Sequence, residues 1–208
     1  MIDKVNQIAG LDSIVICAAG GLPGELHRHW KSQSSGSYHA EYAFSCMGYE
    51  IAAGIGVKLA YPEKKVFVMV GDGSYLMMHS ELLTAQHYGL KINIIVLDNH
   101  GFGCINRLQQ SCGSTSFGNL MKKEKGLDFL KNAQSYGCHA EKANSLEELS
   151  QCLVRNKMSD NTCVTIIETS PEHSTPGLVW WDVPVAEVSQ KESVQVAYTQ
   201  YRKQLEEI

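Results

Sequence analysis

The chain has 208 residues, a formal net charge of −4 and 19% charged residues, so it is long enough for one substantial core and has the composition of a soluble globular protein. The acidic balance, without a dense Lys/Arg cluster, argues against a nucleic-acid partner. No apolar stretch approaches the length of a membrane span, and the first ten residues lack the pattern of a signal peptide. The seven cysteines, an odd number without Cys-x-x-Cys pairs, favour reduced thiols in a cytoplasmic protein over a zinc site.

Short apolar runs alternate along the chain with stretches of helical periodicity. In the first half of the chain we expect strands at 13–17, 66–70 and 92–97, with helices at 48–59 and 75–87 between them. In the second half we expect a helix at 127–136, a short strand near 138–141, a helix from the capping box 145–148 to about 157, and a strand at 162–168. A final polar helix should run from the capping box 189–192 to the C-terminus. Several runs are apolar and β-branched throughout, which is typical of strands covered on both faces.

This alternation predicts an α/β fold, a doubly wound parallel sheet with helices on both faces, because parallel strands need helical crossovers. We expect one domain over residues 1–188, followed by a C-terminal helix over 189–208. In such sheets ligands bind at the carboxyl ends of the strands, near the point where the strand order reverses.

Glycines and oxygen-bearing side chains follow the two central predicted strands. Gly71-Asp72-Gly73-Ser74 leaves one strand, and Asp98-Asn99-His100-Gly101 leaves the next, so Asp72 and Asn99 are 99 − 72 = 27 positions apart. Glycines let the backbone approach a ligand closely, and the free N–H groups at a helix start favour phosphate. A carboxylate there would repel phosphate unless a cation lay between them, and carboxylate, amide and carbonyl oxygens suit Mg²⁺.

The two turns therefore predict a site for Mg²⁺ and a diphosphate. A single Gly-Asp-Gly is more commonly an ordinary turn, and the second oxygen-rich turn is what favours a site. The sequence contains neither the G-x-G-x-x-G of nicotinamide-binding units after a strand nor the G-x-x-x-x-G-K-[ST] of a P-loop.

Gly-Asp-Gly-Ser, followed about 27 residues later by Asn-x-Gly, resembles the cofactor signature of thiamine-diphosphate enzymes. The resemblance extends to Phe44-Ser45-Cys46-Met47-Gly48 and the small-residue run 52–56, which are similar to the segment that holds the cofactor's aminopyrimidine. It implies a thiamine-diphosphate-binding fold, with residues 1–188 as the diphosphate-binding domain and with thiamine diphosphate and Mg²⁺ as cofactors.

The resemblance also implies roles for individual residues. Asp72, the Asn99 side chain and the Gly101 carbonyl would bind Mg²⁺. The diphosphate would be contacted by small residues at the strand ends, namely Gly71, Gly73, Ser74 and Gly101. Gly20 and Gly21, after the first strand, would also touch it, although a simple turn is an equal alternative there.

The segment before the small-residue run would hold the aminopyrimidine through Ser45, Cys46 and Met47. The Ser45 carbonyl would accept a hydrogen bond from the 4′-amino group, and Met47 would wedge the cofactor into a bent form. Standing alone, Met47 would be interpreted as core filler.

A narrower resemblance comes from Met47-Gly48-Tyr49-Glu50-Ile51-Ala52, where many relatives have Leu-Pro, together with GDGSYLMM, DNHGFGCIN and the late Trp180-Trp181. These segments are similar to those of trihydroxycyclohexane-1,2-dione hydrolases, the ring-opening enzymes of myo-inositol breakdown. The resemblance is weakest between Asn119 and Leu127. It implies hydrolytic C–C cleavage of the cyclic dione to 5-deoxyglucuronate. An acetolactate-synthase-like lyase or 2-oxoacid decarboxylase, and a non-catalytic cofactor-binding module, remain alternatives.

Members of this family also need a pyrimidine-binding domain, which supplies a glutamate that activates the cofactor from the partner subunit. Glu41 and Glu50 do not match that role and are interpreted as local structure or substrate-side residues. We therefore expect that this domain lies outside the chain, that the chain alone is inactive, and that it forms a homo-oligomer, with a dimer as the family's unit. The catalytic residues stay unassigned, with His100 a candidate for proton transfer, whereas His27, His29 and His79 are interpreted as surface or structural residues. Trp180 and Trp181 are interpreted as packing the tail onto the domain.

Overall fold

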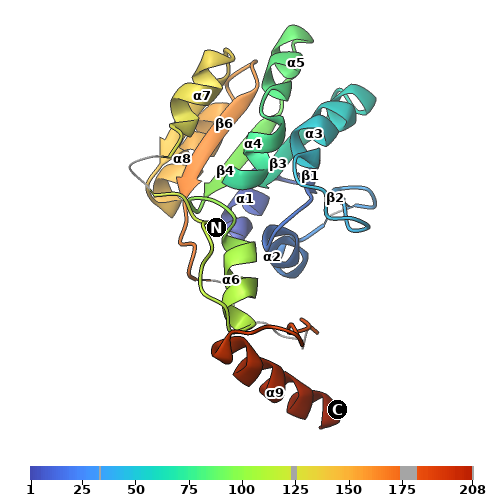
Figure 1. Cartoon of the computed structure of the whole chain (residues 1–208). Helices are drawn as coiled ribbons and strands as arrows, with labels where there is room; N and C mark the ends of the chain where they lie inside the picture. The colour runs from blue at the N-terminus through green and yellow to red at the C-terminus, as the bar shows by residue number, and fades with distance from the viewer. Residues whose placement is uncertain (33, 123–125, 174–181, 208) are drawn as a thin grey trace.

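Six segments pair as strands in the order β2-β1-β3-β4-β6-β5 in the computed structural model, which describes residues 1–32, 34–122, 126–173 and 182–207 (Figure 1). The strands are β1 (Ser13–Cys17), β2 (Tyr38–Ala40), β3 (Lys65–Gly71), β4 (Asn93–Asp98), β5 (His139–Ala143) and β6 (Cys163–Glu168). Every neighbouring pair is parallel. The predicted α/β sheet is therefore confirmed.

Helices cover both faces of this sheet (Figure 1). They are α1 (Ile2–Ala9), α2 (Leu22–His29), α3 (Tyr49–Ala60), α4 (Asp72–Met78), α5 (Glu81–His87), α6 (Gly103–Ser111), α7 (Phe129–Ser135), α8 (Leu146–Asn156) and α9 (Glu192–Glu206). None of them, within the described ranges, is long and apolar enough to cross a membrane.

The core has two halves because successive side chains of a strand point to opposite faces. On β3, Val66, Val68 and Val70 pack into a cluster with α3, α4, α5 and α7. Phe67 and Met69 pack into the other cluster, with α1, α2 and α8. The apolar run of this strand is therefore covered on both faces, as its sequence predicted.

Some predicted elements differ from the structure. The predicted helix 75–87 is two helices, because the chain turns at 79–80 and the N–H groups of Leu82 and Leu83 bond to carbonyls three residues back. The capping box predicted at 189–192 does not form: Lys191 is the N-cap of α9 and makes no side-chain cap. Ser145 does cap α8, with its Oγ accepting from the Glu148 N–H at 3.1 Å. Trp180 and Trp181 lie outside the described residues.

The strand order places the predicted binding edge at the reversal point. From β1 the chain crosses to β2 on one side, and then returns to β3 and β4 on the other. The carboxyl ends of β1, β3 and β4 are therefore neighbours at the switch point, where ligands of such folds bind. At the far end, α9 extends away from the sheet beyond α6 (Figure 1). It packs closely on the loop after α6, since a methyl group at Gly113 would lie 2.5 Å from Ser193 O.

Candidate cofactor-binding site

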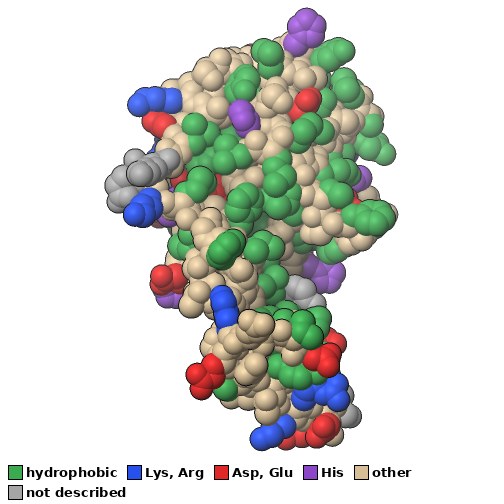
Figure 2. Space-filling model, viewed as in Figure 1, with side chains coloured by type: hydrophobic (Ala, Val, Ile, Leu, Met, Phe, Trp, Pro, Cys, Tyr) green, Lys and Arg blue, Asp and Glu red, His purple; other side chains and the backbone are tan. Residues whose placement is uncertain are grey.

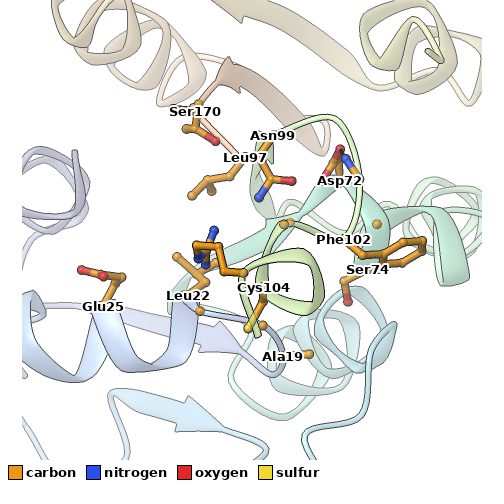
Figure 3. A pocket seen from close by; sticks show the side chains of 18 of the residues that line it. Ala19, Leu22, Glu25, Asp72, Ser74, Leu97, Asn99, Phe102, Cys104 and Ser170 are labelled. Atoms are coloured by element: carbon orange, nitrogen blue, oxygen red, sulfur yellow. Dashed lines mark hydrogen bonds between the residues drawn. The ribbon is translucent and has the colours of Figure 1, made fainter. Parts of the chain in front are cut away.

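A cavity of about 700 Å³ opens at the carboxyl ends of β1, β3 and β4 (Figure 3). Its lining includes almost every residue that the sequence predicted for the site: Gly20, Gly21, Ser45, Met47, Gly71, Asp72, Gly73, Ser74, Asn99 and Gly101. Cys46 is the exception. It does not line the cavity, and its N–H donates to Glu41 Oε2 at 2.7 Å.

The three predicted metal ligands converge on one point. Asp72 is fully buried, and its Oδ2 accepts a hydrogen bond from the Gly101 N–H at 2.6 Å. One atom of the Asn99 side-chain amide lies 3.1 Å from Asp72 Oδ1 and 2.8 Å from Gly101 O. If that atom is the amide nitrogen, it donates to both oxygens. If it is the amide oxygen, three acceptors face one another with no proton between them.

The second arrangement is compatible with a magnesium site. Oxygens bound to Mg²⁺ at 2.0–2.1 Å in an octahedron lie about 3 Å from their neighbours, which matches the two separations at Asn99. The donors are a carboxylate, an amide and a backbone carbonyl, all hard oxygen ligands. Within the described residues no group of three His, Cys, Asp or Glu side chains could hold a metal. This oxygen cluster therefore fits the metal that the sequence predicted, and a search for acidic or histidine clusters alone would miss it.

The charge of Asp72 is costly without a cation. Burial raises the pKa of its carboxyl to about 6, the nearby Asp98 adds to the rise, and hydrogen bonds from the Gly101 and Gly73 N–H groups oppose it. A divalent cation beside a carboxylate reverses this balance because it stabilises the ionised form. The buried Asp72 is thus suited to bind a cation.

The turn Asp98-Asn99-His100-Gly101, called the metal turn below for the ligands predicted in it, is held in place by the segment 119–121. The Phe102 N–H donates to Asn119 O at 2.8 Å, and the Met121 N–H donates to His100 O at 2.7 Å. Gly101 has a φ of 130°, and a methyl group there would lie 2.5 Å from Asn119 O, so only glycine fits. The family resemblance is weakest over 119–127, and yet this segment begins with the residues that fix a predicted ligand.

His100 does not reach the cavity. Its ring lies between two carboxylates, with Nδ1 3.3 Å from Asp98 Oδ1 and Nε2 3.3 Å from Glu168 Oε1. It lines a neighbouring hollow with Glu168 and with Ser170, which lines the cavity as well. These contacts join the metal turn to the end of β6, so we interpret His100 as a residue that supports this turn. His79 has the structural place that its sequence context predicted, stacked on Tyr75 and hydrogen-bonded to the Tyr136 hydroxyl at 3.1 Å.

His173 lines the cavity, although no motif in the sequence singles it out. Its Nδ1 lies 2.8 Å from the Ser170 hydroxyl, in the loop that follows β6. The signal that would have found it is its place after a third strand end at the same edge of the sheet.

Glu50 is a buried carboxyl directly beneath the site, with 1% of its surface exposed. The Ser74 hydroxyl lies 2.9 and 2.8 Å from its two oxygens and donates to it, while accepting from the Gly48 N–H at 2.8 Å. Ser74 therefore has its hydroxyl engaged inside the protein, and a ligand could use only its backbone N–H. Burial raises the pKa of Glu50. Its interpretation as local structure agrees with these contacts.

The turn before α3 brings Met47 to the cavity. Glu41 holds this turn by accepting from the N–H groups of Phe44 at 3.0 Å and Cys46 at 2.7 Å. Ser45 has a φ of 49°, unusual for a residue with a side chain, and its hydroxyl donates to Ala18 O at 3.2 Å. The half-buried Met47 side chain thus lies where a cofactor in the cavity would meet it.

A comparison with known protein families decides the assignment. The family model described as "Thiamine pyrophosphate enzyme, C-terminal TPP binding domain" matches residues 18–167, from the end of β1 to β6. The chain belongs to this family. The residues that the TPP-binding family model matches include the ends of β3 and β4, which carry the oxygen cluster.

Relatives of this TPP-binding domain are much longer proteins. The chain is 46% identical over 207 residues to the 3D-(3,5/4)-trihydroxycyclohexane-1,2-dione hydrolase of Bacillus licheniformis, covering 97% of the chain and 32% of that protein. It is 47% identical over 204 residues to the protein of the same name from Clostridium botulinum, covering 92% and 32%. The chain therefore spans about a third of the length of the curated relatives that it matches.

The fold also matches a solved structure. The thiamine diphosphate-dependent 4-hydroxybenzoylformate decarboxylase of Rhodococcus jostii RHA1 superposes with a TM-score of 0.75 at 22% identity, over 81% of this chain and 32% of that one. This likeness shows the fold of the TPP-binding domain.

Proposed function

We propose that this chain is the thiamine-diphosphate- and Mg²⁺-binding domain of an enzyme that opens the ring of a trihydroxycyclohexane-1,2-dione by hydrolysis to 5-deoxyglucuronate. The observation that carries the cofactor assignment is the oxygen cluster of Asp72, Asn99 and Gly101 beside the cavity. The substrate is supported by identities of 44–47% to relatives named as hydrolases of this dione, over more than nine-tenths of the chain.

The residues of the chain divide the work of holding the cofactor. Asp72, Asn99 and Gly101 hold Mg²⁺, which neutralises part of the diphosphate charge. The glycines at the ends of β1 and β3 let the diphosphate approach the backbone, and Met47 supports the bend between the two rings. When bound, thiamine diphosphate supplies a nucleophilic carbon that adds to a carbonyl and takes up the electrons of the cleaved C–C bond.

A second domain or subunit completes the site in this proposal. The two glutamates considered from the sequence are both engaged within the chain, Glu50 by Ser74 and Glu41 by the N–H groups of Phe44 and Cys46. These contacts favour a structural role for both. We therefore propose that a pyrimidine-binding domain or subunit supplies the activating carboxylate, in a homo-oligomer whose pocket lies between the two domains.

Two measurements test the proposal. Calorimetry on the chain should show binding of thiamine diphosphate that depends on Mg²⁺ and disappears with EDTA. In an enzyme completed by a pyrimidine-binding domain, the cyclic dione should be consumed with one equivalent of acid formed and no CO₂ released. Release of CO₂ from 2-oxoacids, with the dione untouched, would replace the hydrolase assignment by a decarboxylase or lyase and leave the cofactor assignment intact.

A further inference from the structure

The charges around the cavity do not balance those of the proposed ligand. A diphosphate carries roughly two to three negative charges at neutral pH. Among the described lining residues, Asp3, Glu25 and Asp72 are acidic, and Arg107 is the single lysine or arginine. One Mg²⁺ offsets only two charges, and Asp72 takes up one of these. A further cation beside the diphosphate would lower the electrostatic cost of binding.

Arg107 lies next to the metal turn. It belongs to α6, which begins at Gly103, directly after the turn. A methyl group on Gly103 would lie 2.9 Å from Asn99 Nδ2 and 3.4 Å from Arg107 Nη1. The guanidinium and the Asn99 amide therefore both lie where a side chain at position 103 would project.

The other side of the guanidinium meets the end of β1. A methyl group on Gly21 would lie 3.2 Å from Arg107 Nη2, so Nη2 stands where a side chain at position 21 would project. The segment 18–21 is Ala-Ala-Gly-Gly and offers no side-chain donor of its own. Arg107 thus supplies, from α6, the donor that this loop lacks.

One hydrogen bond fixes the side chain without using up its donors. Nη1 donates to Pro171 O at 3.1 Å, in the loop after β6. An arginine has five N–H donors in a rigid fork, so the edge that faces Gly21 keeps donors for an anion. The Pro171 contact thereby orients the fork between the metal turn and the loop after β1.

We propose that Arg107 is a phosphate-binding residue of this domain, which contacts the diphosphate between the metal turn and the Gly20-Gly21 loop. The inference rests on the proposed function, because it takes the ligand to be thiamine diphosphate. It adds a side-chain cation to a site in which the sequence predicted only a metal ion and backbone groups.

The test compares variants of the chain, each completed by a pyrimidine-binding domain, by calorimetry with Mg²⁺ and either thiamine diphosphate or inorganic pyrophosphate. Arg107→Ala should weaken the binding of both ligands about 10- to 100-fold, which is the range expected for the loss of a hydrogen bond to a charged group. Arg107→Lys should keep part of the affinity because it keeps the charge. The dependence of log Kd on log salt concentration should be shallower in Arg107→Ala, since one ionic contact is lost. The matched control is Arg202→Ala, an exposed arginine of α9, which should change neither affinity nor salt slope.

The possible results separate the two claims. If the unmutated chain, completed by a pyrimidine-binding domain, binds neither ligand with Mg²⁺, the proposed function fails. If it binds both and Arg107→Ala binds equally well, the role of Arg107 is refuted while the proposed function stands. If Arg107→Ala and Arg107→Lys both weaken binding, but with an unchanged salt slope and a lower unfolding temperature, Arg107 only ties α6 to Pro171, and the inference is again wrong.

Discussion

Asp72, Asn99 and Gly101 bring three oxygen-bearing groups together at the cavity, which Arg107 also lines and where Glu50 holds the Ser74 hydroxyl. The motif around Asp72 predicted the metal ligands because carboxylate, amide and glycine recur at two strand ends. Arg107 and Glu50 carry no such pattern. Each becomes informative only through contacts with residues from distant segments, Gly21 and Pro171 for one, Ser74 for the other. These contacts join segments that are far apart in the chain, and no local pattern in the sequence indicates them.

Replacing Asp72 by Asn should abolish the metal site and leave the fold intact. The amide keeps an acceptor for the Gly101 N–H but removes the charge that attracts Mg²⁺. We expect binding of Mg²⁺ with thiamine diphosphate to weaken more than about 100-fold, since a direct ligand matters at least as much as the groups that support one. The metal-free unfolding temperature should be equal to or above that of the unmutated chain, because the buried group no longer carries a costly charge.

Thermal unfolding with and without Mg²⁺ and thiamine diphosphate measures both effects at once, because a ligand that binds only the folded state raises the unfolding temperature. An undiminished rise in the Asp72→Asn variant would refute the ligand assignment.

Glu50 and Ser74 should behave as one energetic unit. Glu50→Ala leaves the Ser74 hydroxyl without its acceptor in a buried site, which should lower the free energy of unfolding by about 1–3 kcal/mol. Glu50→Gln retains an acceptor oxygen and should lose less. Urea denaturation of Glu50→Ala, Ser74→Ala and the double variant should show a non-additive coupling of at least about 0.5 kcal/mol. Additive losses would mean that the two groups do not support each other.

At the scale of elements, the sequence identified those whose pattern matches their burial. Strands β3, β4 and β6 are mostly apolar or β-branched and are covered on both faces, so their composition alone indicates them. No such pattern indicates β2, a three-residue edge strand without a fully buried side chain. The helices α1, α2 and α6 were not predicted either. Helix α2 carries Gly24 and α6 starts at Gly103, both poor helix formers, and their helical state is set by packing beside the cavity.

The helix α3 offers a matched pair of glycines that tests its packing. A methyl group on Gly54 would lie 2.6 Å from Val68 Cγ2 on β3, whereas one on Gly56 would meet nothing within 4 Å. Gly54→Ala should therefore destabilise the chain by about 1–3 kcal/mol through overpacking. Gly56→Ala should stabilise it by about 0.5–1 kcal/mol through helix propensity. Chemical denaturation of both variants checks this prediction, and equal effects would contradict the close contact of α3 with β3.

At the scale of the whole molecule, the binding edge is rich in exposed apolar side chains. Phe44 is 85% exposed, Met77 50%, Tyr49 41% and Met78 37%. The turn before α3 contacts α4, since a methyl group on Gly48 would lie 2.7 Å from Met78 Cγ. Figure 2 shows hydrophobic side chains gathered on the face that carries α4 and α6 in Figure 1. Exposed apolar patches of this kind commonly mark interfaces.

We expect the chain to associate with itself or with a pyrimidine-binding domain through this surface. Sedimentation over a concentration series should show association that weakens in a Phe44→Ser, Met77→Ser double variant. Met158→Ser is the matched control, because Met158 is 87% exposed after α8, away from the strand ends that form the binding edge. A chain that stays monomeric at all concentrations, also after a pyrimidine-binding domain is added, would refute this interface.

One of the three oxygens of the cluster, the carbonyl of Gly101, belongs to the backbone. This limits which substitutions can change the retention of a bound cofactor. Side-chain substitution can delete the oxygens of Asp72 and Asn99, but no substitution deletes the carbonyl of Gly101. Its position is set through the hydrogen bonds of the neighbouring peptide groups to 119–121. We therefore expect small displacements of that segment to change the residence time of the cofactor and to leave the ligand chemistry unchanged. Libraries that vary the length and sequence just after Met121 would sample slow and fast cofactor exchange on one unaltered ligand set.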